Sequence, residues 1–192
     1  MADIEKAIEW FRYRLNGTPH SVDYSMANRN GEWSYDCSSS VYYALIEAGF
    51  LPEGTWIGNT DSLFNDLEKA GWQKLPRNAD GSVNVERGDI FIWGTRGASG
   101  GAFGHTGIFE TGTNDPDPEI IIHCNYANNG ISESYHDDFW ALAGYPETAF
   151  YRPPAPAQRP EVAQVESRPV NGMSMDELKE ALKQALREGV GI

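Results

Sequence analysis

The chain has 192 residues, enough for one domain with a substantial core and a short appendage. Its 28 acidic residues outnumber its 15 basic residues and give a formal net charge of −13, so we expect no nucleic-acid binding and no stable membrane binding. Two cysteines make no disulfide framework, and the amphipathic N-terminus lacks the apolar core of a signal peptide. These features predict a soluble protein of a reducing cytoplasm.

Three helices are predicted in the first half of the chain. Residues 3–15 have the apolar spacing of an amphipathic helix that packs against the domain. A second helix begins at Cys37, because Asp36 is a residue type that caps a first turn, and it ends at Gly49. The third helix is predicted over residues 60–70.

Cys37 is the first candidate for chemistry. At the start of a helix, unpaired backbone N–H groups and the helix dipole favour a thiolate over a thiol. A buried structural cysteine is the alternative, but the polar neighbours Asp36 and Ser38 argue against an apolar pocket. We therefore predict that Cys37 is a reactive nucleophile.

From residue 88 onward the pattern changes to short apolar or alternating segments bounded by Gly, Pro and Asp. Four strands are predicted, over residues 89–93, 105–110, 119–125 and 148–152. Helices followed by strands indicate an α+β domain, with N-terminal helices packed on an antiparallel sheet. The glycine-rich loop 94–104 matches no nucleotide-binding fingerprint. We expect it to let the backbone pass close to a ligand, or to move as a flap.

The end of the chain differs in composition. Residues 153–173 are rich in proline and predict an extended, semi-rigid linker. Residues 174–190 begin with a capping-box pattern and predict a C-terminal amphipathic helix. A helix this short is only marginally stable in isolation. Packing on its own domain and self-association or partner binding stay open as alternatives.

A thiolate nucleophile needs a base, and the base needs an orienting group. His105 opens one predicted strand and His123 lies in the next, so neighbouring antiparallel strands can set the two imidazoles side by side near Cys37. Side chains alternate along a strand, which puts His123 and Asn125 on one face and Cys124 on the other, as core filler.

No metal site is predicted. Zinc sites usually contain a close ligand pair such as C-x-x-C or H-x-x-x-H, and the sequence has none. The acidic turn 114–119 could hold calcium, yet it lacks the glycine and the spacing of an EF-hand loop and is interpreted as a solvated turn. The remaining histidines, His20 and His136, lie in polar segments and are expected at the surface.

The motifs around these candidates resemble a known family. Residues 3–152 contain, in order, YSMxxRxGxxxYDCSSSVYYAL, RGDIFIWG, GAFGHTGIF and IIHCNYANNGI. They are similar to bacteriophage peptidoglycan hydrolases, phage lysins of the NlpC-like branch of papain-like cell-wall hydrolases. The resemblance implies a papain-like catalytic domain over residues 1–152, in which a cysteine-bearing helix packs on a small antiparallel sheet or barrel.

The resemblance also implies catalytic roles. Cys37 would be the nucleophile, His105 the general base and His123 the third, orienting residue. Asn125 is a second candidate for the orienting role. The Cys37 thiolate would attack an amide carbonyl while His105 protonates the leaving amine, and water would then release the acyl group from the thioester.

Other matched positions are expected to contact the substrate. Tyr24 matches a tyrosine that lies near the oxyanion site in NlpC-like enzymes, and Asp36 would help to bind substrate. Aromatic residues beside the motifs would line a cleft for glycan or peptide: Trp33, Tyr35, Trp93, Phe103 and Tyr126.

The function that the resemblance implies is that of a phage endolysin that hydrolyses an amide in Gram-positive peptidoglycan without a cofactor. Family members cut either the N-acetylmuramoyl-L-alanine bond or the stem peptide between D-glutamyl or D-glutaminyl and lysine, and we predict the amidase. The alternatives are a structural or wall-binding phage component and an intracellular papain-like protease or deamidase. The endolysin would stay in the host cytoplasm until lysis and then act on the cell wall.

Overall fold

The computed structural model describes residues 1–29 and 32–155. The predicted C-terminal helix, 174–190, lies outside the described residues, as does the predicted linker apart from residues 153–155, which form no regular element. In the described part of the chain, no helix is long and apolar enough to cross a membrane.

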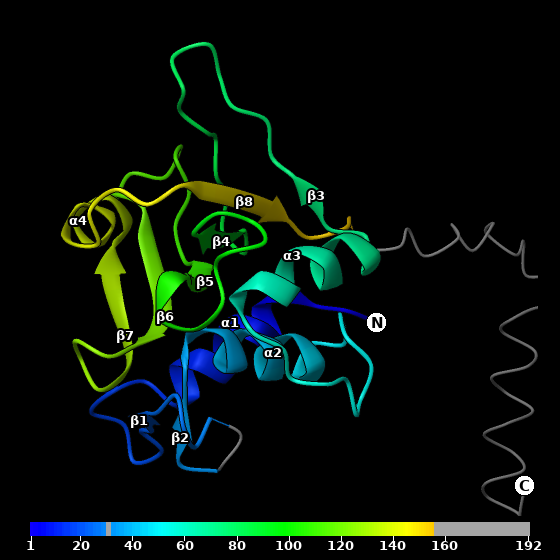
Figure 1. Ribbon diagram of the computed structural model, residues 1–192, viewed down its shortest axis with the longest axis vertical. Helices are drawn as coiled ribbons and strands as arrows, with labels where there is room; N and C mark the ends of the chain where they lie inside the picture. The colour runs from blue at the N-terminus through cyan, green and yellow to red at the C-terminus, as the bar shows by residue number, and fades with distance from the viewer. Residues whose placement is uncertain (30–31, 156–192) are drawn as a thin grey trace, which may run out of the picture. The chain divides into compact units, whose positions relative to one another are not determined.

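Helices precede most of the sheet along the chain, as predicted (Figure 1). The helices are α1 (Ile4–Tyr13), α2 (Cys37–Glu47), α3 (Thr60–Lys69) and α4 (His136–Leu142), with a short 3-10 helix, η1 (Gly101–Phe103). The strands are β1 (Asp23–Tyr24), β2 (Ser34–Tyr35), β3 (Gln73–Lys74), β4 (Ile90–Trp93), β5 (His105–Phe109), β6 (Ile120–Asn125), β7 (Gly130–Tyr135) and β8 (Thr148–Arg152).

Six strands form one antiparallel sheet in the order β3-β8-β4-β5-β6-β7, and β1 and β2 form a separate parallel pair. The four predicted strands are β4, β5, β6 and β8, which include the centre of this sheet. The register sets Trp93 opposite His105 and His123 opposite Ser132. Directly paired residues share a face of the sheet, so this register decides which side chains can meet.

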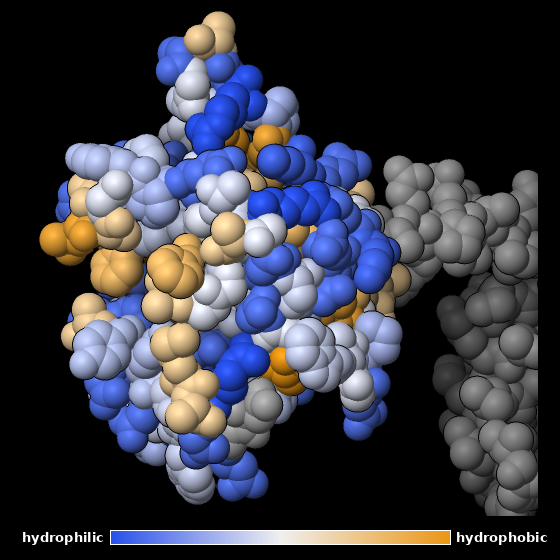
Figure 2. All heavy atoms as spheres, in the orientation of Figure 1, coloured by the Kyte–Doolittle hydropathy of each residue, from blue (hydrophilic) through white to orange (hydrophobic). Residues whose placement is uncertain are grey.

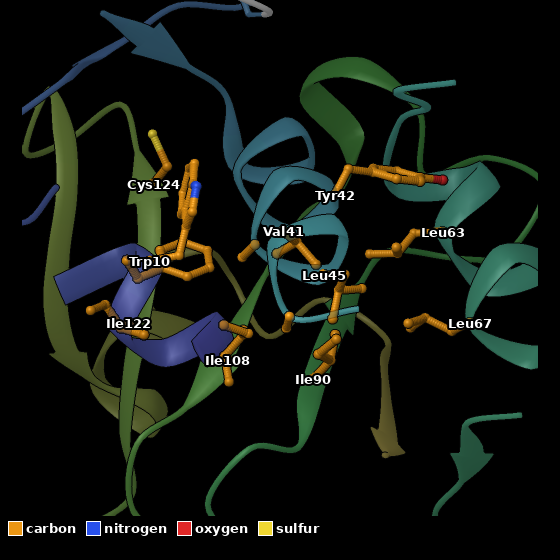
Figure 3. Packing of buried hydrophobic residues seen from close by; sticks show 14 of the residues in the cluster. Trp10, Val41, Tyr42, Leu45, Leu63, Leu67, Ile90, Ile108, Ile122 and Cys124 are labelled. Atoms are coloured by element: carbon orange, nitrogen blue, oxygen red, sulfur yellow. The ribbon is translucent and has the colours of Figure 1, made fainter. Parts of the chain in front are cut away.

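The two faces of the sheet carry different cores. Along β4 the side chains alternate, so that Ile90 and Ile92 join the cluster under α1, α2 and α3, while Phe91 and Trp93 join a second cluster. Partly buried residues of α4, Phe139 among them, pack against this second cluster. Figure 3 shows the first cluster, in which α2 lies between the sheet and α3; it labels Trp10, Val41, Tyr42, Leu45, Leu63, Leu67, Ile90, Ile108, Ile122 and Cys124.

Candidate active site

The N-terminus of α2 is fixed by a reciprocal cap. The Asp36 carboxylate accepts a hydrogen bond from the Ser39 backbone N–H (2.7 Å), and the Asp36 N–H donates to Ser39 Oγ (3.0 Å). This capping box stops the helix from extending toward the N-terminus. Cys37 is therefore the first residue of the helix, as the sequence predicts.

The Cys37 sulfur lies in a buried place. Only 5% of the residue is exposed, and Sγ lies 4.0 Å from both Thr60 Oγ1 and the Gly104 carbonyl oxygen. Burial raises the pKa of the Cys37 thiol to about 12, the Asp36 carboxylate adds to the rise, and the Thr60 hydroxyl offsets part of it. Burial therefore opposes the expected resting thiolate, because the neighbours Asp36 and Ser38, polar in sequence, are themselves buried.

His105 and His123 form a hydrogen-bonded pair, as predicted. The distance from His105 Nε2 to His123 Nδ1 is 2.6 Å. Burial beside Trp93 and Phe139 lowers the pKa of His105 to about 4, although Asp36 opposes the shift. His123 is fully buried, and burial together with the neighbouring His105 holds its pKa well below the usual range. Both rings are therefore neutral near pH 7.

Cys37 and His105 come from the starts of two elements, α2 and β5. The His105 ring packs with Phe91 and Trp93. The Cys37 thiol contacts the Gly104 carbonyl just before His105 in the chain. Across the described ranges, no hydrogen bond joins the thiol to the His105 ring. In unliganded enzymes such contacts are often long and tighten when substrate binds.

Gly107 is a site residue that the sequence analysis missed. A Cβ at this position would lie 2.7 Å from both His123 Cβ and the Ile122 carbonyl oxygen. Only a glycine lets β5 and β6 come together with the His123 side chain beside His105. The available signal was a glycine inside a predicted strand, which often marks close approach of another backbone.

Arg29 is a second missed residue. Its guanidinium donates to both Asp36 carboxylate oxygens (2.6 and 3.2 Å), to Ser38 Oγ (2.9 Å) and to the Gly58 carbonyl (2.5 Å). Asp36 is 7% exposed and has its oxygens occupied by Arg29 and the helix cap, so the structure does not support its expected contact with substrate. The feature of the sequence that could have identified Arg29 is its place in the motif YSMxxRxG.

Tyr24 lies near the nucleophile. Burial raises the pKa of Tyr24, and the nearby Cys37 and Asp36 raise it further, so the phenol keeps its proton and can donate a hydrogen bond. Its ring packs edge-on against Tyr126, with 6.0 Å between ring centroids.

The aromatic residues expected in a cleft divide into two groups. Trp33, Phe103 and Tyr126 are 72–84% exposed and can meet a ligand. Trp93 and Tyr35 are buried, at 2% and 5% exposed, so the prediction that they line a cleft is wrong; they are core residues. On the face seen in Figure 2, apolar side chains form small patches within a largely hydrophilic surface.

Asn125 is also buried, at 2% exposed, which excludes it from direct contact with substrate in this structure. Its side-chain amide contacts His123, so of the two candidates for the orienting role only His123 makes a hydrogen bond with His105 among the described residues. Cys124 points to the opposite face and is fully buried in the first core cluster, as predicted.

The glycine-rich loop 94–104 is bound to α3. The Asp61 carboxylate accepts hydrogen bonds from the Gly97 N–H (2.5 Å) and Ser99 Oγ (3.2 Å). A Cβ at Gly104 would lie 2.8 Å from Thr60 Cβ. The loop was expected to let the backbone pass close to a ligand. In the structure, its backbone at Gly104 passes close to Thr60 of α3.

His136 is not at the surface, contrary to expectation: it is 4% exposed. Ligand atoms of Glu119, His136 and Asp137 lie within 4.8 Å of one another, a grouping that the sequence did not predict. His136 Nδ1 lies 3.0 Å from Asp137 Oδ1, while its Nε2 is buried and has no hydrogen-bond partner among residues 1–29 and 32–155. A metal on Nδ1 would force a proton onto Nε2, where the described residues offer no acceptor, so this grouping fits a metal poorly.

A cavity of about 300 Å³ lies beside α4, and it contains none of the predicted site residues. It is lined by Arg77, Gly81, Ser82, Val83, Val85, Thr113, Glu119, His136, Asp137, Trp140, Thr148 and Phe150. His20, in contrast to His136, is exposed as expected and stacks on Tyr13.

Comparisons with known proteins agree with this architecture. Residues 3–159 match the family described as bacteriophage peptidoglycan hydrolase. The lysin of Pneumococcus phage Dp-1 is 47% identical over 150 residues, which cover 78% of this chain and 46% of the lysin. The structure of NlpC1 from Trichomonas vaginalis superposes with a TM-score of 0.50 at 16% identity, covering 79% of this chain and 44% of NlpC1.

This chain therefore spans less than half the length of either relative. The likeness to NlpC1 shows the fold, which is the papain-like NlpC-type fold expected from the sequence. Because the family match covers most of the chain and the lysin shares nearly half of the aligned residues, this protein belongs to the bacteriophage peptidoglycan hydrolase family.

Proposed function

We propose that this chain hydrolyses an amide bond of Gram-positive peptidoglycan through a thioester on Cys37, and that the bond is the N-acetylmuramoyl-L-alanine amide. Membership of the family supports the substrate class. The observation that carries the chemistry is the contact of the Cys37 thiol, at the start of α2, with the Gly104 carbonyl, directly before His105 of the hydrogen-bonded His105–His123 pair. A nucleophile, a base and an orienting group are the parts that such a reaction needs.

The burial of the site defines how the reaction begins. Because the Cys37 thiol and the His105 ring are both neutral at rest, His105 takes the thiol proton as the sulfur attacks the amide carbonyl. His105, now an imidazolium, gives this proton to the departing amine. It then removes a proton from the water that cleaves the thioester.

The negative oxygen of the tetrahedral intermediate needs hydrogen-bond donors. The Cys37 backbone N–H at the free end of α2 is one, and the protonated Tyr24 phenol is the other. The exposed aromatic side chains of Trp33, Phe103 and Tyr126 supply flat apolar surfaces against which sugar rings or peptide can pack.

Digestion of purified Gram-positive cell walls tests this proposal. Wild type releases soluble fragments, Cys37→Ala releases none, and Cys124→Ala is the matched control because that cysteine lies in the core. Mass spectrometry of the new ends identifies the bond. Stem peptides that begin with L-alanine establish the amidase, whereas a new N-terminal lysine establishes the stem-peptide endopeptidase. Absence of release from the walls of several hosts contradicts the enzymatic function and favours a wall-binding component.

A further inference from the structure

Two side chains contact the far ring nitrogen of His123. Nε2 lies 3.1 Å from Ser134 Oγ and 3.3 Å from Asn125 Nδ2. Ser134 lies on β7, next to β6 in the sheet. The chain of contacts thus runs from His105 through His123 to these two polar groups.

Asn125 can offer only N–H groups to His123. Its Oδ1 accepts a hydrogen bond from the Asn128 backbone N–H (2.9 Å), which fixes the orientation of the amide. Its Nδ2 donates to Ser132 Oγ (2.8 Å) and has its second hydrogen left for His123. Ser134 is therefore the hydrogen-bond acceptor of the pair, because a hydroxyl oxygen can accept where an amide nitrogen cannot.

The two groups differ in the tautomers of His123 that they can satisfy: Asn125 can only donate to Nε2, whereas the Ser134 hydroxyl can also accept from it. A neutral imidazole has one N–H, and the proton between His105 Nε2 and His123 Nδ1 belongs to one ring only. If His123 Nε2 accepts a hydrogen bond from Asn125, the proton of His123 lies on its Nδ1 and is donated to His105 Nε2. The proton of His105 must then lie on His105 Nδ1. That leaves His105 without a free nitrogen for the Cys37 proton.

The opposite arrangement is productive. If His123 carries its proton on Nε2, Ser134 Oγ accepts it, and His123 Nδ1 accepts the Nε2–H of His105. His105 Nδ1 then has a free lone pair with which to take a proton from the Cys37 thiol.

We propose that Ser134 is a positioning residue that accepts the Nε2 proton of His123 and so selects the tautomer in which His105 can act as the base. This proposal rests on the proposed function for the role of the His105 base. The selection of the tautomer itself depends only on the contacts of His123.

Imidazole nitrogen NMR of the full chain, without substrate and near pH 7, tests the selection directly. In wild type, the proton of His123 is expected on Nε2; in Ser134→Ala it is expected to move to Nδ1. Ser132→Ala is the matched control, since Ser132 lies on the same strand and hydrogen-bonds Asn125, while the described residues show no hydrogen bond from its hydroxyl to the His123 ring. A wild-type His123 protonated on Nδ1, or a tautomer unchanged in Ser134→Ala, overturns the proposal.

Wall hydrolysis gives the second readout. Ser134→Ala is expected to lower kcat about 10- to 100-fold with little change in KM, and Ser134→Thr, which keeps the hydroxyl, to restore most of it. Equal losses in Ser134→Ala and Ser132→Ala indicate a merely structural role and contradict the proposal. If wild type hydrolyses no wall while NMR places the proton on Nε2, the proposed function fails and the tautomer selection by Ser134 stands.

Discussion

Cys37 shows that a helix terminus does not by itself make a thiolate. Favourable interaction of a charge with a helix end contributes about 2 kcal/mol at most. Removing a full charge from water costs several kcal/mol. Burial therefore outweighs the helix terminus at Cys37, and the pKa of its thiol moves up instead of down. Reactivity then depends on proton transfer to His105 during attack.

Alkylation of Cys37 by iodoacetamide tests this neutral resting state. In Cys124→Ala, where Cys37 is the only thiol, the rate is expected to rise steadily with pH from about 6 to 10, because only the thiolate reacts. A preformed thiolate–imidazolium pair gives instead a rate that is already high and nearly constant around neutral pH. Such a plateau contradicts the neutral site.

Gly107 provides a steric test of the histidine pair. Gly107→Ala is expected to push His123 away from His105 and to lower kcat at least about 100-fold, a loss comparable with that of general base catalysis. Gly100→Ala is the matched control, because its Cβ would lie 3.5 Å from Asn59 Nδ2, in ordinary contact. Equal activity of the two variants in the wall assay contradicts the packing argument.

At the scale of elements, the cap of α2 joins fold and site. Asp36 caps the helix and also neutralises Arg29, which ties the segment before β2 to α2. Asp36→Ala removes the cap and leaves a largely buried guanidinium without its partner. We expect a loss of about 3 kcal/mol in the free energy of unfolding.

Asn59→Ala is the comparison for this prediction. Asn59 caps α3 with the same reciprocal hydrogen bonds but is exposed and has no ion pair with an arginine among the described residues. Loss of the Asn59 cap should lower the free energy of unfolding by about 1 kcal/mol. Urea unfolding of both variants measures the difference, and equal losses contradict a special role for the Asp36–Arg29 pair.

The elements were predictable to different degrees. The strands β4, β5, β6 and β8 consist largely of apolar residues, so the sequence indicates them directly. By contrast, β7 has the sequence GISESY, and it is formed by pairing along β6 and not by a strong pattern of its own. Its position matters, since β7 brings Ser134 to His123.

At the scale of the whole molecule, the burial of two neutral histidines lowers the stability of the folded protein in acid. The pKa of His105 falls from an ordinary 6.5 to about 4 in the folded chain, and that of His123 falls as well. Below pH 6.5 the unfolded chain therefore binds protons that the folded chain does not. The free energy of unfolding is expected to drop as pH falls from about 6.5 toward 4, by roughly 1–2 kcal/mol at pH 5 from His105 alone.

Urea unfolding between about pH 7 and pH 5 measures this loss. His105→Gln is expected to reduce the pH dependence to the part that His123 contributes, because the uncharged amide does not titrate in either state. His20→Gln, at an exposed position, should leave the dependence unchanged. A wild-type stability that stays constant over this range contradicts the burial of neutral rings.

The sequence by itself determined the helix that begins at Cys37, the four apolar strands and the adjacency of His105 and His123. These depend on local caps, on periodicity and on the alternation of a strand, all of which can be read along the chain. The tertiary structure decided what surrounds each group. Burial of Cys37, Trp93 and His136, the space left by Gly107, and the hydroxyl of Ser134 beside His123 depend on contacts between distant segments, which no local pattern encodes.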